Sequence, residues 1–271
     1  MGTDTATATD TGRNAMAALS ETGTFSPVRA PRNDVSPATA EKHVCVVGLG
    51  YIGLPTASLL GTRGYQVTGV DVSKDVVATI NQGRIHIVEP DLDVMVKSAV
   101  HSGRLQATMR PVEADVFIIA VPTPLGRHQE PDISYILNTA EAIGKTLRSG
   151  QLIILESTTY PGTTRDDMMP AIFKAAGDRA KSLQLGRDIF GAFSPEREDP
   201  GRKSHSTSTI PKLVGGLDEV STELAASVYR KGVKEVEMSW ILETNEAMKG
   251  IIEILGGRQS KHYRVYEKAL A

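Results

Sequence analysis

A doubly wound α/β fold with a parallel sheet is predicted by short apolar runs, by helical segments that alternate with them, and by a glycine-rich turn. Strands are expected at residues 43–49, 65–72, 115–122, 151–157 and 189–195. These runs are apolar on both faces, which is typical of strands that lie between two layers of helices. The alternation of strands with helices therefore favours a parallel sheet covered on both sides.

The segments that separate these runs have helical patterns. Helices are expected at residues 54–64, 73–83, 132–150 and 218–232. Ser73 is a favourable N-cap, because its hydroxyl can accept a backbone N–H of the first turn. Gly64 and Gly83 are typical helix ends, since glycine readily adopts the left-handed conformation found there.

The stretch "VCVVGLGYIGLPTASLL" reads as a strand, a turn and the start of a helix. Gly48, Gly50 and Gly53 have the spacing G-x-G-x-x-G of a Rossmann-type dinucleotide-binding turn. The first glycine permits the tight turn, the second lets the backbone approach a pyrophosphate, and the third allows close helix packing. Tyr51 and Ile52 lie in the same turn, at the helix N-terminus that would face the phosphates, and are also predicted to bind the cofactor.

Asp71 follows the second predicted strand, about 20 residues beyond the glycines, where a carboxylate binds the ribose of a dinucleotide. An acid here disfavours a 2′-phosphate, so NAD is the predicted cofactor in preference to NADP. The alternative is an ordinary strand–helix turn followed by a solvated aspartate.

The overall composition points away from several classes of partner. The formal net charge is −2, which gives no reason to expect nucleic acid or a membrane surface as a partner. The single cysteine, Cys45, rules out an internal disulfide and predicts a reducing cytoplasm. The six histidines lack the spacing of metal ligands, so no metal site is predicted.

Residues 1–41 are rich in Thr, Ala, Ser, Pro and Asp and contain few large apolar residues. Such a segment cannot bury enough apolar surface to offset the entropy lost on ordering. We therefore predict a disordered tail.

The part of the chain from His43 to about Gly216 resembles the UDP-glucose/GDP-mannose dehydrogenase family in its NAD-binding domain. The motifs that carry this resemblance are "VVGLGYIGLPTA", "GVDVSKDVVATINQG", "IHIVEPDLD", "FIIAVPTPL", "PDISYI", "ESTTYPGTT", "FSPEREDPG" and "PKLVGG". The resemblance implies an NAD-dependent oxidation of the C6 hydroxyl of a nucleotide sugar to a carboxylate.

Three of these motifs bear on the substrate. "IHIVEPDL" is similar to the UDP-N-acetylmannosamine dehydrogenases, whereas "ESTTYPGTT" and "FSPEREDPG" are similar to the UDP-N-acetylglucosamine 6-dehydrogenases. The resemblance therefore implies a UDP-N-acetylhexosamine and leaves its epimer open.

The same resemblance implies roles for individual side chains. Thr123 matches a threonine that lies beside the nicotinamide and orders a catalytic water, and Glu196 matches the glutamate that assists proton transfer. Glu156, Ser157 and Thr158 match a turn that closes over the cofactor. Each of the two residues also has an alternative interpretation. Thr123 lies between prolines and could cap a turn, and Glu196 could form a surface ion pair with the arginine after it.

Full-length members of the family also have a central helix with a catalytic lysine and asparagine, and a loop cysteine that attacks the aldehyde. No segment here matches that loop, and Cys45 lies in the first predicted strand, where it reads as a small buried apolar residue. We therefore expect a truncated dehydrogenase that does not complete the oxidation alone. The alternative is a non-catalytic NAD-binding module. Family members dimerise mainly through the central helix, so the oligomeric state is not inferred.

The last 40 or so residues, 231–271, show no dehydrogenase motif. "SWILETNEAM" and "YRVYEK" resemble the closing strand–helix–strand of GNAT-type N-acetyltransferases. A short β-α-β appendage is therefore expected. Acetyl transfer is not expected, because the loop that binds the pyrophosphate of acetyl-CoA in those enzymes has no match in this chain. The chain is thus divided into the tail (1–41), the NAD-binding dehydrogenase domain (42–230) and this appendage (231–271).

Overall fold

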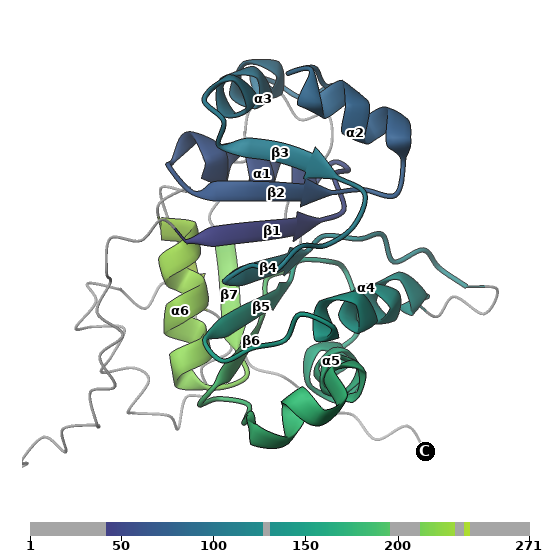
Figure 1. Cartoon of the computed structure of the whole chain (residues 1–271), viewed down its shortest axis with the longest axis vertical. Coiled ribbons are helices and arrows are strands. Elements are labelled where there is room, and N and C mark those ends of the chain that lie inside the picture. Colours follow the sequence, from purple (N-terminus) through teal and green to yellow (C-terminus); the bar gives the residue numbers. More distant parts are fainter. Residues whose placement is uncertain (1–41, 127–130, 196–211, 231–235, 239–271) are drawn as a thin grey trace, which may run out of the picture. The chain divides into compact units, whose positions relative to one another are not determined.

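The computed structural model describes residues 42–126, 131–195, 212–230 and 236–238 of the 271-residue chain (Figure 1). The predicted tail, the candidate Glu196 and all but three residues of the predicted appendage lie outside these ranges. The predictions for those parts therefore stay predictions.

The strands form one sheet in the order β3-β2-β1-β4-β5-β6-β7-β8. Figure 1 labels β1 to β7. Their bounds are β1 His43–Val47, β2 Gln66–Val70, β3 Leu105–Thr108, β4 Val116–Ile119, β5 Gln151–Leu155, β6 Ile189–Phe193, β7 Lys212–Gly216 and β8 Val236–Met238. Strands β1 to β6 are parallel, β7 is antiparallel to β6, and β8 is parallel to β7. The first six strands have the order of a dinucleotide-binding fold, with the strand order reversing between β1 and β4.

Two layers of helices cover the sheet. Their bounds are α1 Gly53–Thr62, α2 Lys74–Asn81, α3 Leu92–His101, α4 Ser134–Gly144, α5 Met169–Ala176 and α6 Glu219–Arg230. Figure 1 shows α4 and α5 on one side of the sheet and α6 on the other. The predicted doubly wound α/β fold is confirmed.

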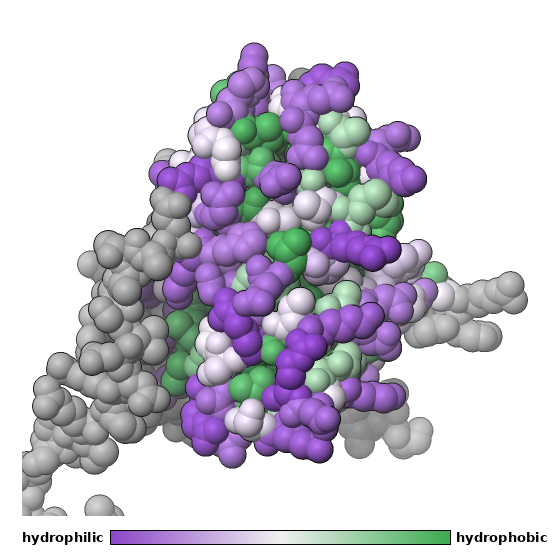
Figure 2. Space-filling view, viewed as in Figure 1, coloured by the Kyte–Doolittle hydropathy of each residue, from purple (hydrophilic) through white to green (hydrophobic). Residues whose placement is uncertain are grey.

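The core consists of two apolar clusters, one on each face of the sheet. In β1, Val44 and Val46 belong to the cluster that includes α1, α3 and α6, whereas Cys45 and Val47 belong to the cluster that includes α4 and α5. Alternate residues of a strand point to opposite faces, so both faces of β1 are buried. In Figure 2, hydrophilic residues predominate on the visible face, and hydrophobic residues form small groups between them.

The predicted helix caps are largely confirmed. The Ser73 hydroxyl accepts the backbone N–H of Val76 at 3.4 Å, and α2 is followed by Gly83 at φ 69°. Gly64, after α1, has φ 94°. The helix expected at 132–150 was predicted too long: α4 ends at Gly144, and the chain reaches Gly150, at φ 85°, before β5 begins.

Several elements go beyond the predicted set. They are α3, β3, α5 and β7, together with a π-helical segment at Thr163–Met168 and a 3₁₀ segment at Gly177–Ser182. Strand β3 alternates buried and exposed residues because it lies at the edge of the sheet, so it lacks the continuous apolar run of its neighbours.

Part of the segment beyond residue 230 belongs to the sheet. Strand β8 lies near the start of the predicted appendage, and Val236 pairs with Lys212 of β7. The helix and final strand of the predicted appendage lie outside the described residues, so the acetyltransferase-like interpretation stays a prediction. None of the helices in the described parts of the chain is both long enough and apolar enough to cross a membrane.

Candidate cofactor-binding site

The glycine turn joins β1 to α1 at the point where the strand order of the sheet reverses. Gly48 has φ +94°, and a Cβ atom placed there would lie 2.4 Å from the carbonyl oxygen of Ala120. A Cβ atom at Gly53 would lie 1.7 Å from the carbonyl oxygen of Gly48. These two glycines are therefore required by the fold itself.

Gly50 differs from its two neighbours. A Cβ atom placed there would meet no atom of the described residues within 4 Å, and its φ is not positive. The packing of the described parts of the chain thus gives no reason for glycine at this position. Open space beside the backbone, ahead of the N-terminus of a helix, fits the close approach of a pyrophosphate. Tyr51 and Ile52 complete the turn, and the Tyr51 side chain is exposed.

Asp71 follows β2 and its carboxylate faces the glycine turn. One carboxylate oxygen accepts the backbone N–H of Leu49 at 3.1 Å, and the other accepts that of Ser73 at 2.9 Å. Each oxygen retains further acceptor capacity, since a carboxylate has about four lone-pair positions. The carboxylate is thus held in a fixed orientation next to the turn and can still accept a ribose hydroxyl.

The turn after β5 carries three of the predicted residues. Ser157 is buried and its hydroxyl donates to the carbonyl oxygen of Val121 at 2.7 Å. The hydroxyl of Thr123, in the loop after β4, donates to the carbonyl oxygen of Thr158, whose side chain is exposed. Thr123 and Thr158 therefore lie together at the carboxyl ends of β4 and β5.

Glu156 lies in the same turn but faces the interior, with 1% of its surface exposed. Its carboxylate forms a buried ion pair with Lys212 of β7. It also accepts the hydroxyl of Tyr229 of α6 at 2.8 Å and that of Thr56 of α1 at 3.3 Å. Lys212, Tyr229 and Thr56 were not predicted as site residues. No local pattern links them, because their separations from Glu156 are 56, 73 and 100 residues.

Glu196 is the one predicted site residue outside the described ranges. The chain that leads to it leaves the sheet at the carboxyl end of β6, where the backbone N–H of Ser194 donates to the carbonyl oxygen of Leu155 at 2.9 Å. The role of Glu196 stays a prediction.

Cys45 lies within β1 and is fully buried. Burial raises the pKa of its thiol to about 11, which suppresses the reactive thiolate. This agrees with the prediction that Cys45 is a packed core residue and not a nucleophile. In the described ranges, no group of three or more His, Cys, Asp or Glu side chains is arranged to hold a metal ion.

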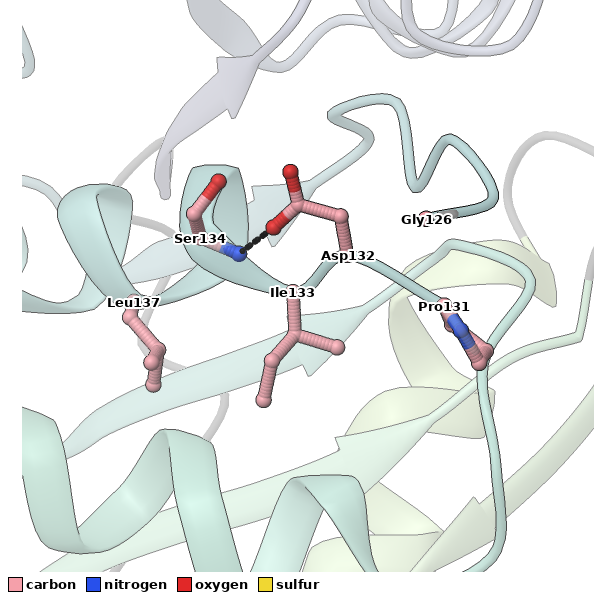
Figure 3. Close-up of a pocket in the computed structure, with 6 residues that line it drawn as sticks. All are labelled: Gly126, Pro131, Asp132, Ile133, Ser134 and Leu137. Atoms are coloured by element: carbon pink, nitrogen blue, oxygen red, sulfur yellow. Dashed lines mark hydrogen bonds between the residues drawn. The ribbon is translucent and has the colours of Figure 1, made fainter. Parts of the chain in front are cut away.

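A separate pocket of about 490 Å³ lies at the start of α4 (Figure 3). Its lining residues are Gly126, Pro131, Asp132, Ile133, Ser134 and Leu137. The backbone N–H of Ser134 donates to the Asp132 carboxylate at 2.9 Å, and this bond lowers the pKa of that carboxyl. None of the site residues predicted from the sequence lines this pocket.

The fold and the glycine turn define the class: a dinucleotide-binding domain of the kind found in dehydrogenases. Comparison with known sequences is more specific. The sequence model described as "UDP-glucose/GDP-mannose dehydrogenase family, NAD binding domain" matches residues 42–233. The chain belongs to this family, and NAD is the cofactor of the matched domain, as predicted.

Individual relatives agree with this assignment. The chain is 44% identical over 190 residues to a UDP-N-acetyl-D-mannosamine dehydrogenase of Campylobacter jejuni, covering 69% of this chain and 46% of the relative. It is 44% identical over 195 residues to an NDP-N-acetyl-D-galactosaminuronic acid dehydrogenase of Ralstonia nicotianae, covering 71% of this chain and 46% of that relative.

Among solved structures, a UDP-D-ManNAc dehydrogenase from Pyrococcus horikoshii superposes with a TM-score of 0.65 at 37% identity, covering 72% of this chain and 46% of that one. The chain thus spans about half the length of the relatives that it matches.

Proposed function

We propose that this chain provides the cofactor-binding part of an NAD-dependent nucleotide-sugar 6-dehydrogenase that converts a UDP-N-acetylhexosamine to the uronic acid. The observation that carries the proposal is the position of the Asp71 carboxylate, fixed by the N–H groups of Leu49 and Ser73 at the edge of the glycine turn. The oxidation of an alcohol to a carboxylate removes four electrons and takes up one oxygen from water, so two molecules of NAD, bound in turn, would each accept one hydride.

Each part of the site has a distinct task in this proposal. The backbone of the turn from Gly48 to Gly53, with Tyr51 and Ile52, binds the pyrophosphate through N–H groups that the first turn of a helix leaves unpaired. Asp71 accepts the ribose hydroxyls and repels a 2′-phosphate, which makes the site selective for NAD.

The proposed chemistry on the substrate side rests on Thr123 and Glu196. A threonine hydroxyl can orient a water without reacting, and a carboxylate can accept the proton that the water gives up. The contact between Thr123 and Thr158 supports this assignment, because it holds the Thr123 hydroxyl at the carboxyl end of the sheet.

The relatives support the proposed substrate class. Those named above act on nucleotide sugars that carry an N-acetyl group, which supports a UDP-N-acetylhexosamine as substrate here. The mannosamine and glucosamine epimers both remain candidates. The cytoplasmic location and the domain limits of 42–230 are likewise part of the proposal.

A second candidate function is a non-catalytic NAD-binding module. The burial of Cys45 favours it, because the single thiol of the chain is enclosed in β1 and its pKa is raised to about 11. A nucleophilic thiol, which the family uses for the second oxidation, is therefore not offered by this residue.

One experiment separates the two candidates. The purified full chain is incubated with NAD and with UDP-N-acetylmannosamine or UDP-N-acetylglucosamine, and the formation of NADH is followed by absorbance. Binding of NAD is measured on the same sample by calorimetry. NADH formation supports the dehydrogenase, bound NAD without NADH supports the module, and a folded chain that binds no NAD contradicts both.

A further inference from the structure

The buried ion pair of Glu156 and Lys212 is part of a hydrogen-bonded network that includes Tyr229. We infer that Glu156, Lys212 and Tyr229 are positioning residues. They hold the turn after β5 in place from the interior of the fold and thereby shape the nicotinamide half of the site. This inference rests on the proposed NAD binding. Glu156 was predicted to bind the cofactor, whereas in this inference its side chain acts on the cofactor only indirectly, through the turn.

The network joins elements that are far apart in the sequence. Glu156 directly follows β5, Lys212 begins β7, Tyr229 lies in α6, and Thr56 lies in the helix that begins at the glycine turn. Lys212 also lies 5.8 Å from the centre of the Tyr229 ring, within reach of a cation–π interaction. One carboxylate therefore ties the turn to three other elements of the fold.

Burial makes this network sensitive to small changes. Glu156 is 1% exposed and Lys212 is 5% exposed, so water cannot replace a lost partner. A buried charge that loses a hydrogen bond is costly. We therefore expect the turn to move when Glu156 loses a partner. Because Ser157 and Thr158 follow directly, any shift of Glu156 moves the hydroxyl and carbonyl that contact Val121 and Thr123.

The location of the turn determines which half of the cofactor is affected. A dinucleotide lies across the point where the strand order reverses, with one mononucleotide over each half of the sheet. Asp71, after β2, marks the adenosine half. The turn after β5 lies on the opposite half, where the nicotinamide is expected. The network should therefore influence binding of the nicotinamide and not of the adenosine.

The test compares two ligands in the full chain. ADP-ribose has the adenosine, pyrophosphate and both riboses of NAD but lacks the nicotinamide. Tyr229→Phe removes the hydroxyl that donates to Glu156 and keeps the ring beside Lys212. Ser227→Ala is the control, because Ser227 lies in the same helix as Tyr229, is exposed, and its hydroxyl donates within the helix to the carbonyl oxygen of Leu224.

Tyr229→Phe is expected to raise the Kd for NAD about two- to thirtyfold, the range typical of coupling through packed networks. The Kd for ADP-ribose should change less than about twofold in the same variant. The contacts to ADP-ribose are distant from Tyr229 and share no partner with it, so the substitution should not affect them. Ser227→Ala should leave both values unchanged. Calorimetric titrations give all the constants, and circular dichroism confirms folding.

Three outcomes would overturn the inference. If Tyr229→Phe weakens both ligands equally, the network supports the fold in general and does not position the nicotinamide half. If it changes neither Kd, the network has no influence on the site. If the unaltered chain binds neither NAD nor ADP-ribose, the proposed function fails and this inference fails with it.

Discussion

The carboxylate of Asp71 accepts the backbone N–H of Leu49 at 3.1 Å, although the two residues are 22 positions apart in the sequence. This bond fixes the acidic group that follows β2 against the turn that follows β1. The two features that together indicate a dinucleotide site are therefore physically joined, and the carboxylate is oriented before any ligand arrives.

The first prediction concerns this carboxylate. Asp71→Ala is expected to raise the Kd for NAD about tenfold to a hundredfold, because hydrogen bonds to a charged group contribute roughly 1.5–3 kcal/mol. Calorimetry measures the change. Asp93→Asn, at an exposed position in the first turn of α3, is the control and should leave the Kd unchanged. Equal affinities for the Asp71 variant and the unaltered chain would place the ribose elsewhere.

The second prediction concerns the choice of cofactor. NADP should bind at least about tenfold more weakly than NAD, because its 2′-phosphate would approach the Asp71 carboxylate and two like charges repel each other. Asp71→Asn should narrow this difference mainly by improving the binding of NADP. Competition of NADP against bound NAD measures the ratio of the two Kd values. A lower Kd for NADP than for NAD would show that the Asp71 carboxylate does not exclude the 2′-phosphate.

The third prediction separates two glycines of one turn. Gly53→Ala should destabilise the fold by about 1–3 kcal/mol or more, since the new Cβ would have to displace the Gly48 carbonyl. Gly50→Ala should unfold at nearly the same temperature as the unaltered chain, because its Cβ meets no atom of the described residues within 4 Å. It should nevertheless bind NAD at least about tenfold more weakly. Thermal unfolding and calorimetry on both variants test this contrast. A Gly50 variant with unchanged affinity would show that the pyrophosphate does not approach this backbone.

The fourth prediction concerns Cys45 and pH. Its thiol pKa is raised from 9.0 to about 11 by burial, so the folded state retains a proton that the unfolded state has lost. The resulting stabilisation is fully present below pH 9 and disappears as the pH rises from about 9 to about 11. A shift of this size corresponds to about 2–3 kcal/mol.

Cys45→Ala provides the control for this effect. Urea unfolding at a series of pH values should show a steeper loss of stability for the unaltered chain than for the variant above pH 9. Parallel curves for the two proteins would mean that the thiol ionises as easily in the folded chain as in the unfolded one.

The features of the fold that depend on local chemistry could be predicted from the sequence. The glycine spacing, the Ser73 cap and the fully buried strands are each visible in a few consecutive residues. Strand β3 was not predicted because an edge strand alternates between buried and exposed residues and has no continuous apolar run. Helix α4 was predicted too long because "KTLRS" continues the helical composition beyond Gly144.

The site was predictable only in part for a related reason. Gly50 and Asp71 belong to one spacing pattern, so their proximity follows from the motif. The environment of Glu156 depends on Lys212 of β7 and Tyr229 of α6. These residues approach Glu156 only because the tertiary fold brings β7 and α6 next to the end of β5. No periodicity in the sequence indicates that a carboxylate next to a polar turn faces inward to meet a lysine.

Hydrogen–deuterium exchange with and without NAD would show whether NAD binds at the glycine turn. We expect slower exchange in the peptides that cover Gly48–Gly53 and Asp71–Ser73 when NAD is present. Protection confined to the pocket around Asp132–Leu137, or no protection anywhere at a saturating concentration of NAD, would show that NAD does not bind at this turn.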